Sequence, residues 1–353
     1  VVPGAKAEET FKMKNRIVTV GGETVQPGTR RIVDLPVADL YTHTSLNMPV
    51  QIINGRRAGP TLFVTAAIHG DEINGVEIIR RLLRLKTLAS IRGTLLAVPI
   101  VNVHGFLDQS RYLPDRRDLN RSFPGSEKGS VAARLAHMLV TEVINQSDCG
   151  IDLHTGSLHR SNLPQIRANL GDPRTRELAQ LFGVPVLLNS GMRDGSLRQY
   201  AAEKGVPMLL YEAGEALRFD ELAIRAGTRG ILNLMRELGM LPRKPVRRPQ
   251  LEPVVANQSS WARAPASGIV RSTARLGQTV KKGDTLAIVS DPFGEVATPL
   301  PARHDGIVIG RSNLPLAHEG DALFNIARFD DVEDAGDTLE DFRIAHGHSS
   351  IDT

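Results

Sequence analysis

Short apolar runs and longer segments of helical periodicity alternate between residues 61 and 238. The apolar runs are typical of buried strands and occupy 61–68, 93–101, 149–155, 163–169, 184–190 and 206–214. Helices are predicted between them at 71–85, 129–145, 196–205 and 220–238. In the first helix the apolar residues recur on one face: Ile73, Val76, Ile79, Leu82 and Leu83. This alternation predicts an α/β fold with a mostly parallel sheet that helices flank on both faces.

The regions on either side of this core follow an all-β pattern. Residues 10–50 contain short β-type stretches separated by Gly and Pro, which predicts an antiparallel segment. Beyond a Pro- and Arg-rich stretch at 241–250, Gly-rich turns again punctuate the chain. Within that region 267–289 and 305–327 read as two copies of one unit, each with a Gly-Ile-Val strand and a Gly-Asp turn before Leu. We therefore predict a small β-sandwich with two-fold internal symmetry.

These patterns divide the chain into five parts. We expect an N-terminal β segment packed on the main domain, the α/β domain itself, a linker, a β-sandwich domain and a frayed tail that begins with acidic residues: 1–47, 48–242, 243–255, 256–330 and 331–353. The basic run at 241–250 is rich in Pro, so we interpret it as solvated linker rather than as a binding patch.

Composition narrows the class of protein. A chain of 353 residues that is 41% hydrophobic can form one large core and a smaller appended domain. Its 43 basic and 39 acidic residues are too evenly balanced for a nucleic-acid binder, so we expect no such partner. No apolar run is long enough to span a bilayer, and we expect no membrane partner. The start carries no signal-peptide pattern, although a chain that begins with Val leaves a removed leader open.

The single cysteine, Cys149, excludes an intramolecular disulfide. One unpaired thiol favours a reducing compartment, so we expect a cytoplasmic protein. Because Cys149 begins an apolar strand, we interpret it as a small buried hydrophobic residue rather than as a nucleophile.

Polar side chains of the kinds that bind metals lie at the ends of predicted strands, where open α/β sheets bind their ligands. "AAIHGDEINGV" (66–76) places His69 and Glu72 within one turn, so that both can reach one ion; alternatively, Glu72 is a helix-start carboxylate and His69 is incidental. His154 ends the strand in "IDLHTG", with Asp152 on the same face. Two His and one carboxylate with an open fourth position form the usual catalytic zinc site. Asp152 either orients a ligand or makes a strand-end salt bridge.

Two further segments carry candidate chemistry. "SRYLPDRRDLNRSFPG" (110–125) contains four arginines and an Asn in an irregular loop. Arginine pairs bidentately with carboxylates, so the loop could bind an acidic substrate, although a solvated basic loop has the same composition. In "LLYEAGE" (209–215), Glu212 follows a buried strand, where it is either a general base or a cap.

Four motifs in this order resemble the succinylglutamate desuccinylase/aspartoacylase family, a relative of the zinc carboxypeptidases. They are His69-x-x-Glu72, "DLNRSFPG" (118–125), "DLH" (152–154) and "EAG" (212–214). The resemblance covers about residues 45–240, and the C-terminal β-domain is also of the type that the family carries. It implies a zinc-carboxypeptidase-like mixed sheet flanked by helices.

The resemblance also implies roles for individual residues. His69, Glu72 and His154 would ligate one Zn²⁺ per chain, and Glu212 would be the general base. Asn120 and Arg121 would hold a carboxylate of the substrate. A further arginine polarises the scissile carbonyl in the family; because the spacing here is longer than the family's, Arg111 is our first choice and Arg116, also a candidate for substrate binding, is the rival.

The leading hypothesis is therefore a zinc-dependent hydrolase that cleaves the amide bond of a small N-acyl amino acid. A carboxypeptidase that trims peptides and a non-catalytic zinc- and carboxylate-binding protein are the alternatives. The β-domain resembles lipoyl- or biotinyl-type sandwiches, but its central hairpin at 289–299 has no lysine to modify, so we expect no swinging-arm cofactor. A lid, an element that forms a homo-oligomer, or a simple scaffold remain open for this domain.

Overall fold

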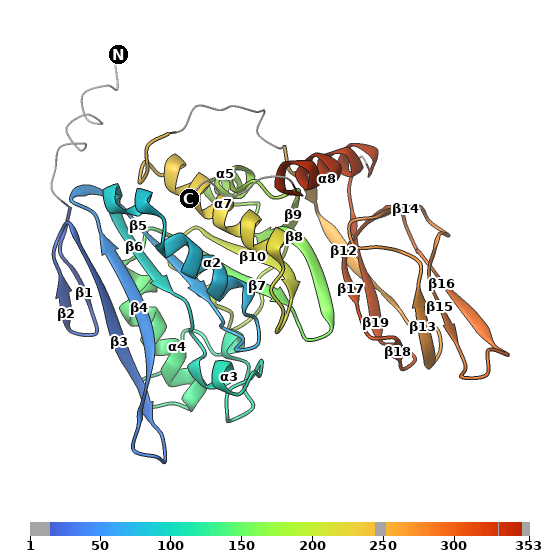
Figure 1. Cartoon of the computed structure of the whole chain (residues 1–353), viewed down its shortest axis with the longest axis horizontal. Coiled ribbons are helices and arrows are strands. Elements are labelled where there is room, and N and C mark those ends of the chain that lie inside the picture. Colours follow the sequence, from blue (N-terminus) through green and yellow to red (C-terminus); the bar gives the residue numbers. More distant parts are fainter. Residues whose placement is uncertain (1–14, 244–251, 331, 348–353) are drawn as a thin grey trace.

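A mixed sheet of 13 strands runs through the molecule, in the order β12-β19-β17-β8-β10-β7-β5-β6-β4-β3, with β9, β11 and β14 beside this path (Figure 1). The structure, a computed structural model, describes residues 15–243, 252–330 and 332–347. Most of the expected linker, 244–251, lies outside the described residues, and its last part forms a strand, β11 (Val254–Ala256), that pairs with β9 (Val186–Asn189).

Four parallel strands form the centre of the sheet. They are mostly buried, β5 only from Thr61 onward: β5 (Arg57–Ala66), β6 (Arg92–Val98), β7 (Cys149–Gly156) and β10 (Met208–Glu215). The next strand, β8 (Arg160–Ala168), runs antiparallel to β10, so the sheet is mixed rather than mostly parallel. Only residues 157–159 join β7 to β8, and a parallel crossover needs a dozen or more residues. The short connection therefore forces the reversal.

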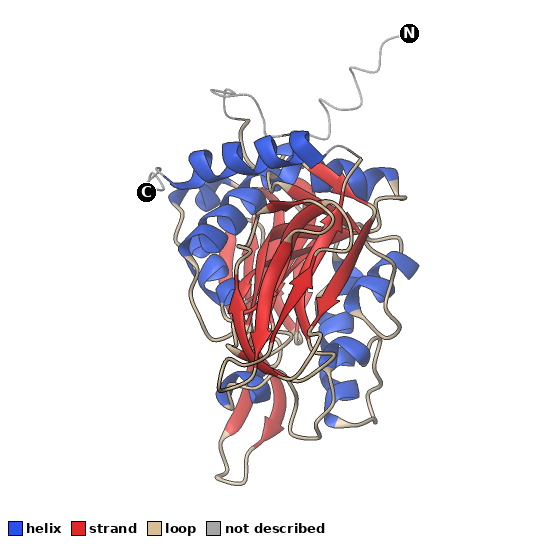
Figure 2. Ribbon diagram, turned by 90° about the vertical axis from the view of Figure 1, so that its right-hand side faces the viewer, coloured by secondary structure: helices blue, strands red, loops and turns tan. Residues whose placement is uncertain are grey.

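Helices cover both faces of this sheet (Figure 2). One face carries α2 (Asn74–Leu83), α5 (Pro173–Phe182) and α7 (Glu221–Glu237), and the other carries α3 (Val103–Leu107), α4 (Val131–Glu142) and α6 (Leu197–Glu203). Short 3-10 turns lie at Lys86–Ser90, Leu119–Arg121 and Ile144–Gln146. Local sequence determines the helix ends. For example, Asp172 is the N-cap of α5 and is followed by Pro173 in the first turn, and the helix ends at Gly183, which has a left-handed φ of 90°.

The N-terminal part forms antiparallel pairs, as its Gly- and Pro-rich pattern predicts. A small hairpin joins β1 (Val18–Val20) to β2 (Glu23–Val25), and the long pair β3 (Thr29–Asp39) and β4 (Ser45–Asn54) forms one edge of the main sheet. Alternate residues of β3 are buried, namely Val33, Leu35 and Val37, and they pack in the core beneath α4.

Two sheets around a shared apolar core make up the C-terminal β-domain. Its strands are β12 (Gln258–Arg263), β13 (Gly268–Ser272), β14 (Thr279–Val280), β15 (Thr285–Ser290), β16 (Ala297–Pro301), β17 (Gly306–Ser312), β18 (Leu316–Ala317) and β19 (Ala322–Arg328). The two sequence copies exchange their short strands, because β14 pairs with β17 and β18 pairs with β13. Since β17 also pairs with β8, one sheet of this domain continues the main sheet.

The expectation of a frayed tail is wrong for residues 332–347, which form the helix α8 (Val332–Gly347). Ala335, Leu339 and Phe342 recur at helical spacing and are buried, so the helix has an apolar face to pack. Cys149 is buried as expected, and burial raises the pKa of its thiol to about 12. Among the described residues, no helix combines the length and the apolar character needed to cross a membrane.

Candidate metal centre

His69 and Glu72 lie in the turn that connects β5 to α2. The strand ends at Ala66, and Ala67 then adopts a left-handed conformation with φ of 52°, which turns the chain away from the sheet. The backbone N–H of Glu72 donates to the carbonyl of His69, so both side chains leave the same tight turn. Gly70 allows this turn to pack closely, because a Cβ at Gly70 would lie 2.0 Å from the carbonyl carbon of Gly105 in α3.

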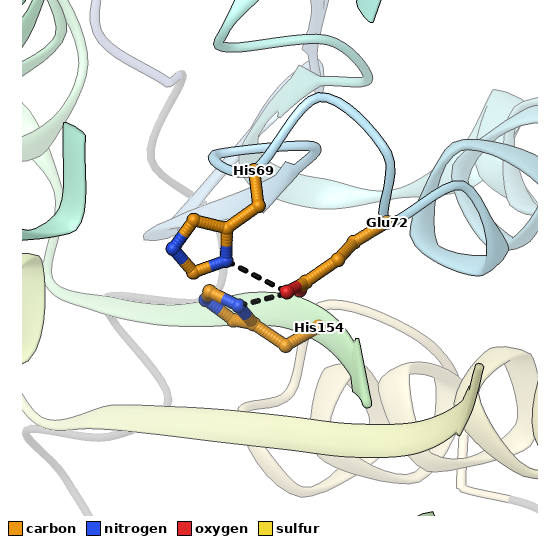
Figure 3. Close-up of side chains that lie close together, drawn as sticks. All are labelled: His69, Glu72 and His154. Carbon is orange, nitrogen blue, oxygen red and sulfur yellow. Dashed lines mark hydrogen bonds and ion pairs between the residues drawn. The ribbon is translucent and has the colours of Figure 1, made fainter. Parts of the chain in front are cut away.

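The third residue of the cluster comes from β7, the strand next to β5. His154 lies inside β7 near its carboxyl end rather than after it, and it is buried like the other two residues. Its Nδ1 atom lies 2.8 Å from Glu72 Oε2, and His69 Nδ1 lies 2.8 Å from Glu72 Oε1 (Figure 3). One potential ligand atom from each residue falls within 4.8 Å of the others. The three side chains therefore present their donors to one common point.

The outer nitrogen of each imidazole is held by a carboxylate. His154 Nε2 lies 2.6 Å from Asp152 Oδ2, and His69 Nε2 lies 3.1 Å from Asp118 Oδ1. Asp152 is in turn fixed by the hydroxyl of Thr65, which donates to Oδ1 at 2.7 Å. Such contacts fix the tautomer and orientation of metal-binding histidines, so Asp152 orients His154, one of the two roles that its position predicts.

The charges of the cluster favour a cation. Burial acts to raise the pKa of Glu72, but the neighbouring charges of His69 and His154 outweigh it and hold that pKa far below its usual range. Burial likewise acts to lower the pKa of His154, yet Asp152 and Glu72 raise it well above 6.5. Three carboxylates surround two imidazoles in a buried site, and two nitrogens with one carboxylate are the donors that Zn²⁺ prefers. The residues present therefore fit a zinc ion.

Arg111 is the arginine that the fold brings to this cluster. Its Nη1 donates to Glu72 Oε1 and its Nη2 to Asp118 Oδ2, both at 3.1 Å. Arg116 is exposed in a turn with φ of 62°, where its backbone N–H donates to the carbonyl of Leu113. Within the described part of the chain, no ion pair joins Arg116 to the cluster. Of the two candidate arginines, Arg111 is therefore the one in contact with the cluster.

Asp118 connects the cluster of His69, Glu72 and His154 to Asn120 and Arg121, which are expected to bind substrate. Its Oδ1 atom also accepts a hydrogen bond from the backbone N–H of Asn120 at 2.8 Å. The Oδ1 of Asn120 accepts from the backbone N–H of Leu197 at 3.0 Å, which fastens the loop to the start of α6. Arg121 is exposed, and one of its guanidinium nitrogens donates to the carbonyl of Asn120. Sequence analysis did not single out Asp118, although it stands in the "DLNR" motif.

Glu212 lies beside the metal cluster. It is paired with His154 in the parallel register of β10 and β7, and paired residues of adjacent strands project to the same face. Glu212 lies within β10 and not beyond it. Its Oε2 atom accepts a hydrogen bond from Asn162 Nδ2 at 2.7 Å and forms an ion pair with Arg167 Nη2, which lies 3.1 Å away.

Three residues around Glu212 were not predicted: Asn162, Arg167 and Arg198. Arg198 is buried on α6, and burial together with the nearby charge of Arg167 lowers its pKa to about 10. It donates to Ser190 Oγ at 2.7 Å and to the carbonyl of Gly191 at 2.8 Å. Asn162 and Arg167 could have been noticed in the sequence as polar residues in or beside the apolar run that forms most of β8.

Known proteins share both the sequence pattern and the fold. Residues 58–238, from β5 to α7, match a family model described as the succinylglutamate desuccinylase/aspartoacylase catalytic domain. The chain is 27% identical over 306 residues to N-alpha-acetyl-L-2,4-diaminobutyric acid deacetylase of Halomonas elongata, a match that covers 83% of this chain and 89% of that protein.

Two solved structures have the same architecture. A succinylglutamate desuccinylase/aspartoacylase from Rhodobacter sphaeroides superposes with a TM-score of 0.75 and 26% identity, over 85% of this chain and 96% of that one. The product-bound ectoine utilization protein EutE (DoeB) from Ruegeria pomeroyi superposes with a TM-score of 0.78 and 25% identity, over 89% and 99% of the two chains. The similarity therefore extends over both the α/β domain and the C-terminal β-domain.

Proposed function

The chain belongs to the succinylglutamate desuccinylase/aspartoacylase family, and on that premise we propose that it is a zinc-dependent deacylase that hydrolyses the amide bond of a small N-acyl amino acid. The observation that carries this proposal is the register of β7 and β10. It sets Glu212 beside His154 on the face where His69, Glu72 and Arg111 also meet. The candidate metal cluster, the contact of Arg111 with it and the register of Glu212 with His154 together support the proposal.

His69, Glu72 and His154 would hold the zinc ion, and Asp118 and Asp152 would keep the two imidazoles in position. When bound there, zinc supplies Lewis acidity, which lowers the pKa of a water molecule from ~15.7 toward ~7 and polarises a carbonyl oxygen. The outer carboxylates also raise the basicity of the imidazoles as ligands.

The reaction itself would use three groups of this chain. Glu212 takes a proton from the attacking water and returns it to the leaving amine, as a general base and then a general acid. Arg111 donates to the oxygen that becomes negative as water adds to the carbonyl carbon. Asn120 and Arg121 bind the carboxylate of the amino acid and so orient the scissile bond. Arg111 reaches the cluster in the structure, and Asp118 connects the cluster to Asn120.

The comparisons support an N-acyl amino acid as the substrate. The Halomonas elongata relative is a deacetylase of Nα-acetyl-L-2,4-diaminobutyric acid, and its similarity to this chain includes the C-terminal domain. We propose a small acylated amino acid for this chain as well. The acyl group and the amino acid are to be found by experiment.

The test is amine release from three N-acyl amino acids and from short peptides, in the presence of zinc. N-acetyl-L-2,4-diaminobutyrate, N-acetyl-L-aspartate and N-succinyl-L-glutamate form the first set, and the Glu212→Gln protein is assayed beside the wild type. Turnover of any of them by the wild type, reduced by about 10²–10⁴ in Glu212→Gln, supports the proposal. Release of residues only from peptide C-termini would indicate a carboxypeptidase. Stoichiometric zinc without any turnover would favour a binding protein.

A further inference from the structure

The strand β8 carries buried polar residues that belong neither to the candidate metal cluster nor to the carboxylates behind it. It pairs with β10 along one edge, and along the other with β17 of the C-terminal domain at residues 160–162 and with β9 at residues 165–168, so both of its edges are paired. Asn162 is 9% exposed and Gln165 is fully buried, and Arg167 has a buried Nε atom with no partner among the described residues. Burying such groups is unfavourable unless they are hydrogen-bonded. A structural role alone would be met better by apolar side chains.

Two of these residues converge on one oxygen of Glu212. Asn162 Nδ2 donates to Oε2 at 2.7 Å, and the charged Arg167 Nη2 lies 3.1 Å from the same atom as an ion pair. In the part of the chain that the structure describes, Oε1 accepts no hydrogen bond. The carboxylate is therefore anchored through one oxygen, and the other is left available for a proton.

The C-terminal domain contacts this arrangement through β17. Gly310 is paired with Asn162 across the junction of β17 and β8, and a Cβ at Gly310 would lie 2.8 Å from Asn162 Oδ1. Three residues further on, Asn313 Nδ2 lies 2.7 Å from both Ser161 Oγ and Glu215 Oε2. The C-terminal domain thus contacts Asn162, which donates to Glu212. It also contacts Glu215, which lies three positions after Glu212 in β10.

We propose that Asn162 and Arg167 are positioning residues for Glu212, and that the C-terminal domain keeps Asn162 in place through Gly310. This proposal rests on the proposed function, because positioning Glu212 matters for catalysis only if Glu212 is the general base. The second domain then takes part in the hydrolysis through β8, without itself touching the substrate.

The first experiment measures kcat and KM of Asn162→Ala and Arg167→Gln on the best substrate among the three N-acyl amino acids. We expect kcat to fall by roughly 10- to 100-fold, a part of what general-base catalysis supplies, with KM changed by less than about 2-fold. Arg167→Lys, which keeps the charge without the planar fork, should retain more activity than Arg167→Gln. Zinc content, measured by mass spectrometry, should equal that of the wild type.

A double-mutant cycle separates positioning from general damage to the fold. In the Glu212→Gln background, adding Asn162→Ala should cause no further loss of kcat, because the group it positions is already gone. A loss of the same size in both backgrounds would overturn the proposal, as would loss of zinc from Asn162→Ala. Wild-type kcat in Asn162→Ala, together with an inactive Glu212→Gln protein, would overturn the positioning role and leave the proposed function intact. An active Glu212→Gln protein would overturn both.

The role of the second domain is tested by Gly310→Ala, with Ser312→Ala on the same strand as the matched control. The added methyl group displaces the Asn162 amide, so kcat should fall several-fold while Ser312→Ala stays at the wild-type value. Thermal unfolding of both variants shows whether they are folded. Should Gly310→Ala not fold, Asn313→Ala in the zinc-loaded full chain, which removes the contacts of the C-terminal domain with Ser161 and Glu215, provides a second measurement at the same junction. A folded Gly310→Ala protein with wild-type kcat would contradict the role of the C-terminal domain.

Discussion

His154 and Glu212 face each other in register on adjacent strands, yet their surroundings are assembled in different ways. His154 is held by Glu72 and Asp152, which come from the parallel strands at the centre of the α/β domain and the turn after one of them. Glu212 is held by Asn162 and Arg167 from the antiparallel strand β8. That strand in turn pairs with β17 of the C-terminal domain.

Because the two residues have different surroundings, zinc binding and turnover should depend on different parts of the chain. The proposed metal ligands and the carboxylates behind them all lie between residues 69 and 154, so this half is complete within the α/β domain. The proposed general base depends on β8, whose other edge pairs partly with β17 of the second domain and partly with β9. We expect changes near His154 to affect zinc first, and changes near Glu212 to affect turnover while zinc remains.

The largest effect is expected for Glu72→Gln, which removes the carboxylate shared by His69 and His154. Loss of the metal removes several kcal/mol of transition-state stabilisation, so activity should fall by ~10³ or more. Zinc content by mass spectrometry and kcat on the best N-acyl amino acid measure the result. Glu221→Gln, at an exposed helix position away from the cluster, is the control and should keep both zinc and activity. Retained zinc in Glu72→Gln would contradict the assignment of this ligand.

The next effect distinguishes the two arginines of the loop after α3. Arg111→Ala should lower kcat by about 10²–10³, as expected for the loss of one donor to the developing oxyanion, with zinc retained. Arg116→Ala should change kcat by less than about 3-fold, because Arg116 lies in an exposed turn. Steady-state kinetics of the two proteins on one substrate decide the matter. Similar losses in both would show that the loop acts as a whole and not through Arg111.

A smaller effect is expected for the carboxylates behind the histidines. Asp152→Asn should weaken zinc binding by ~10- to 100-fold. Asp118→Asn should weaken it less, because its side chain is 17% exposed whereas that of Asp152 is fully buried. Competition with a chromophoric chelator measures both affinities. Equal affinity in Asp152→Asn and the wild type would mean that Asp152 only supports the strand.

The smallest expected effect is a change in the affinity for zinc with pH. Burial acts to lower the pKa values of His69 and His154, but nearby carboxylates outweigh it and raise both above 6.5 in the metal-free protein. Zinc requires neutral imidazoles, so below these raised values protons compete with the metal, and affinity should increase as the pH rises through them. Calorimetry in buffers of different ionisation enthalpy should reveal proton release on binding near pH 7. Binding without proton release would contradict the raised pKa values.

Sequence analysis predicted which residues meet in the cluster because His69, Glu72 and His154 stand in ordered motifs at the ends of apolar runs. It ranked Arg111 before Arg116 but left Arg116 open as the rival, since loop spacing does not show which side chain turns inward. It did not identify Asp118 and Asn162, whose contacts depend on residues 49 and 50 positions away. Such partners follow from the packing of distant segments, which periodicity does not report.

The fold shows the same limit. Alternating apolar runs and helices correctly predicted a sheet with helices on both faces, and the repeated unit predicted a small β-sandwich but not which of its strands pair. The pattern does not carry strand direction, so the reversal at β8 was not predicted, although the short stretch at 157–159 implies it. The tail was expected to fray because its sequence is acidic and because only a few side chains form the apolar face of α8.

The central claim is that one cluster holds the metal while a separate carboxylate moves the proton. It is tested most directly by measuring zinc content and kcat on the same preparation of Glu212→Gln, with an N-acyl amino acid that the wild type hydrolyses. One zinc ion per chain and a kcat lowered by about 10²–10⁴ would agree with the account. Hydrolysis at the wild-type rate, or a protein that no longer retains zinc, would contradict it.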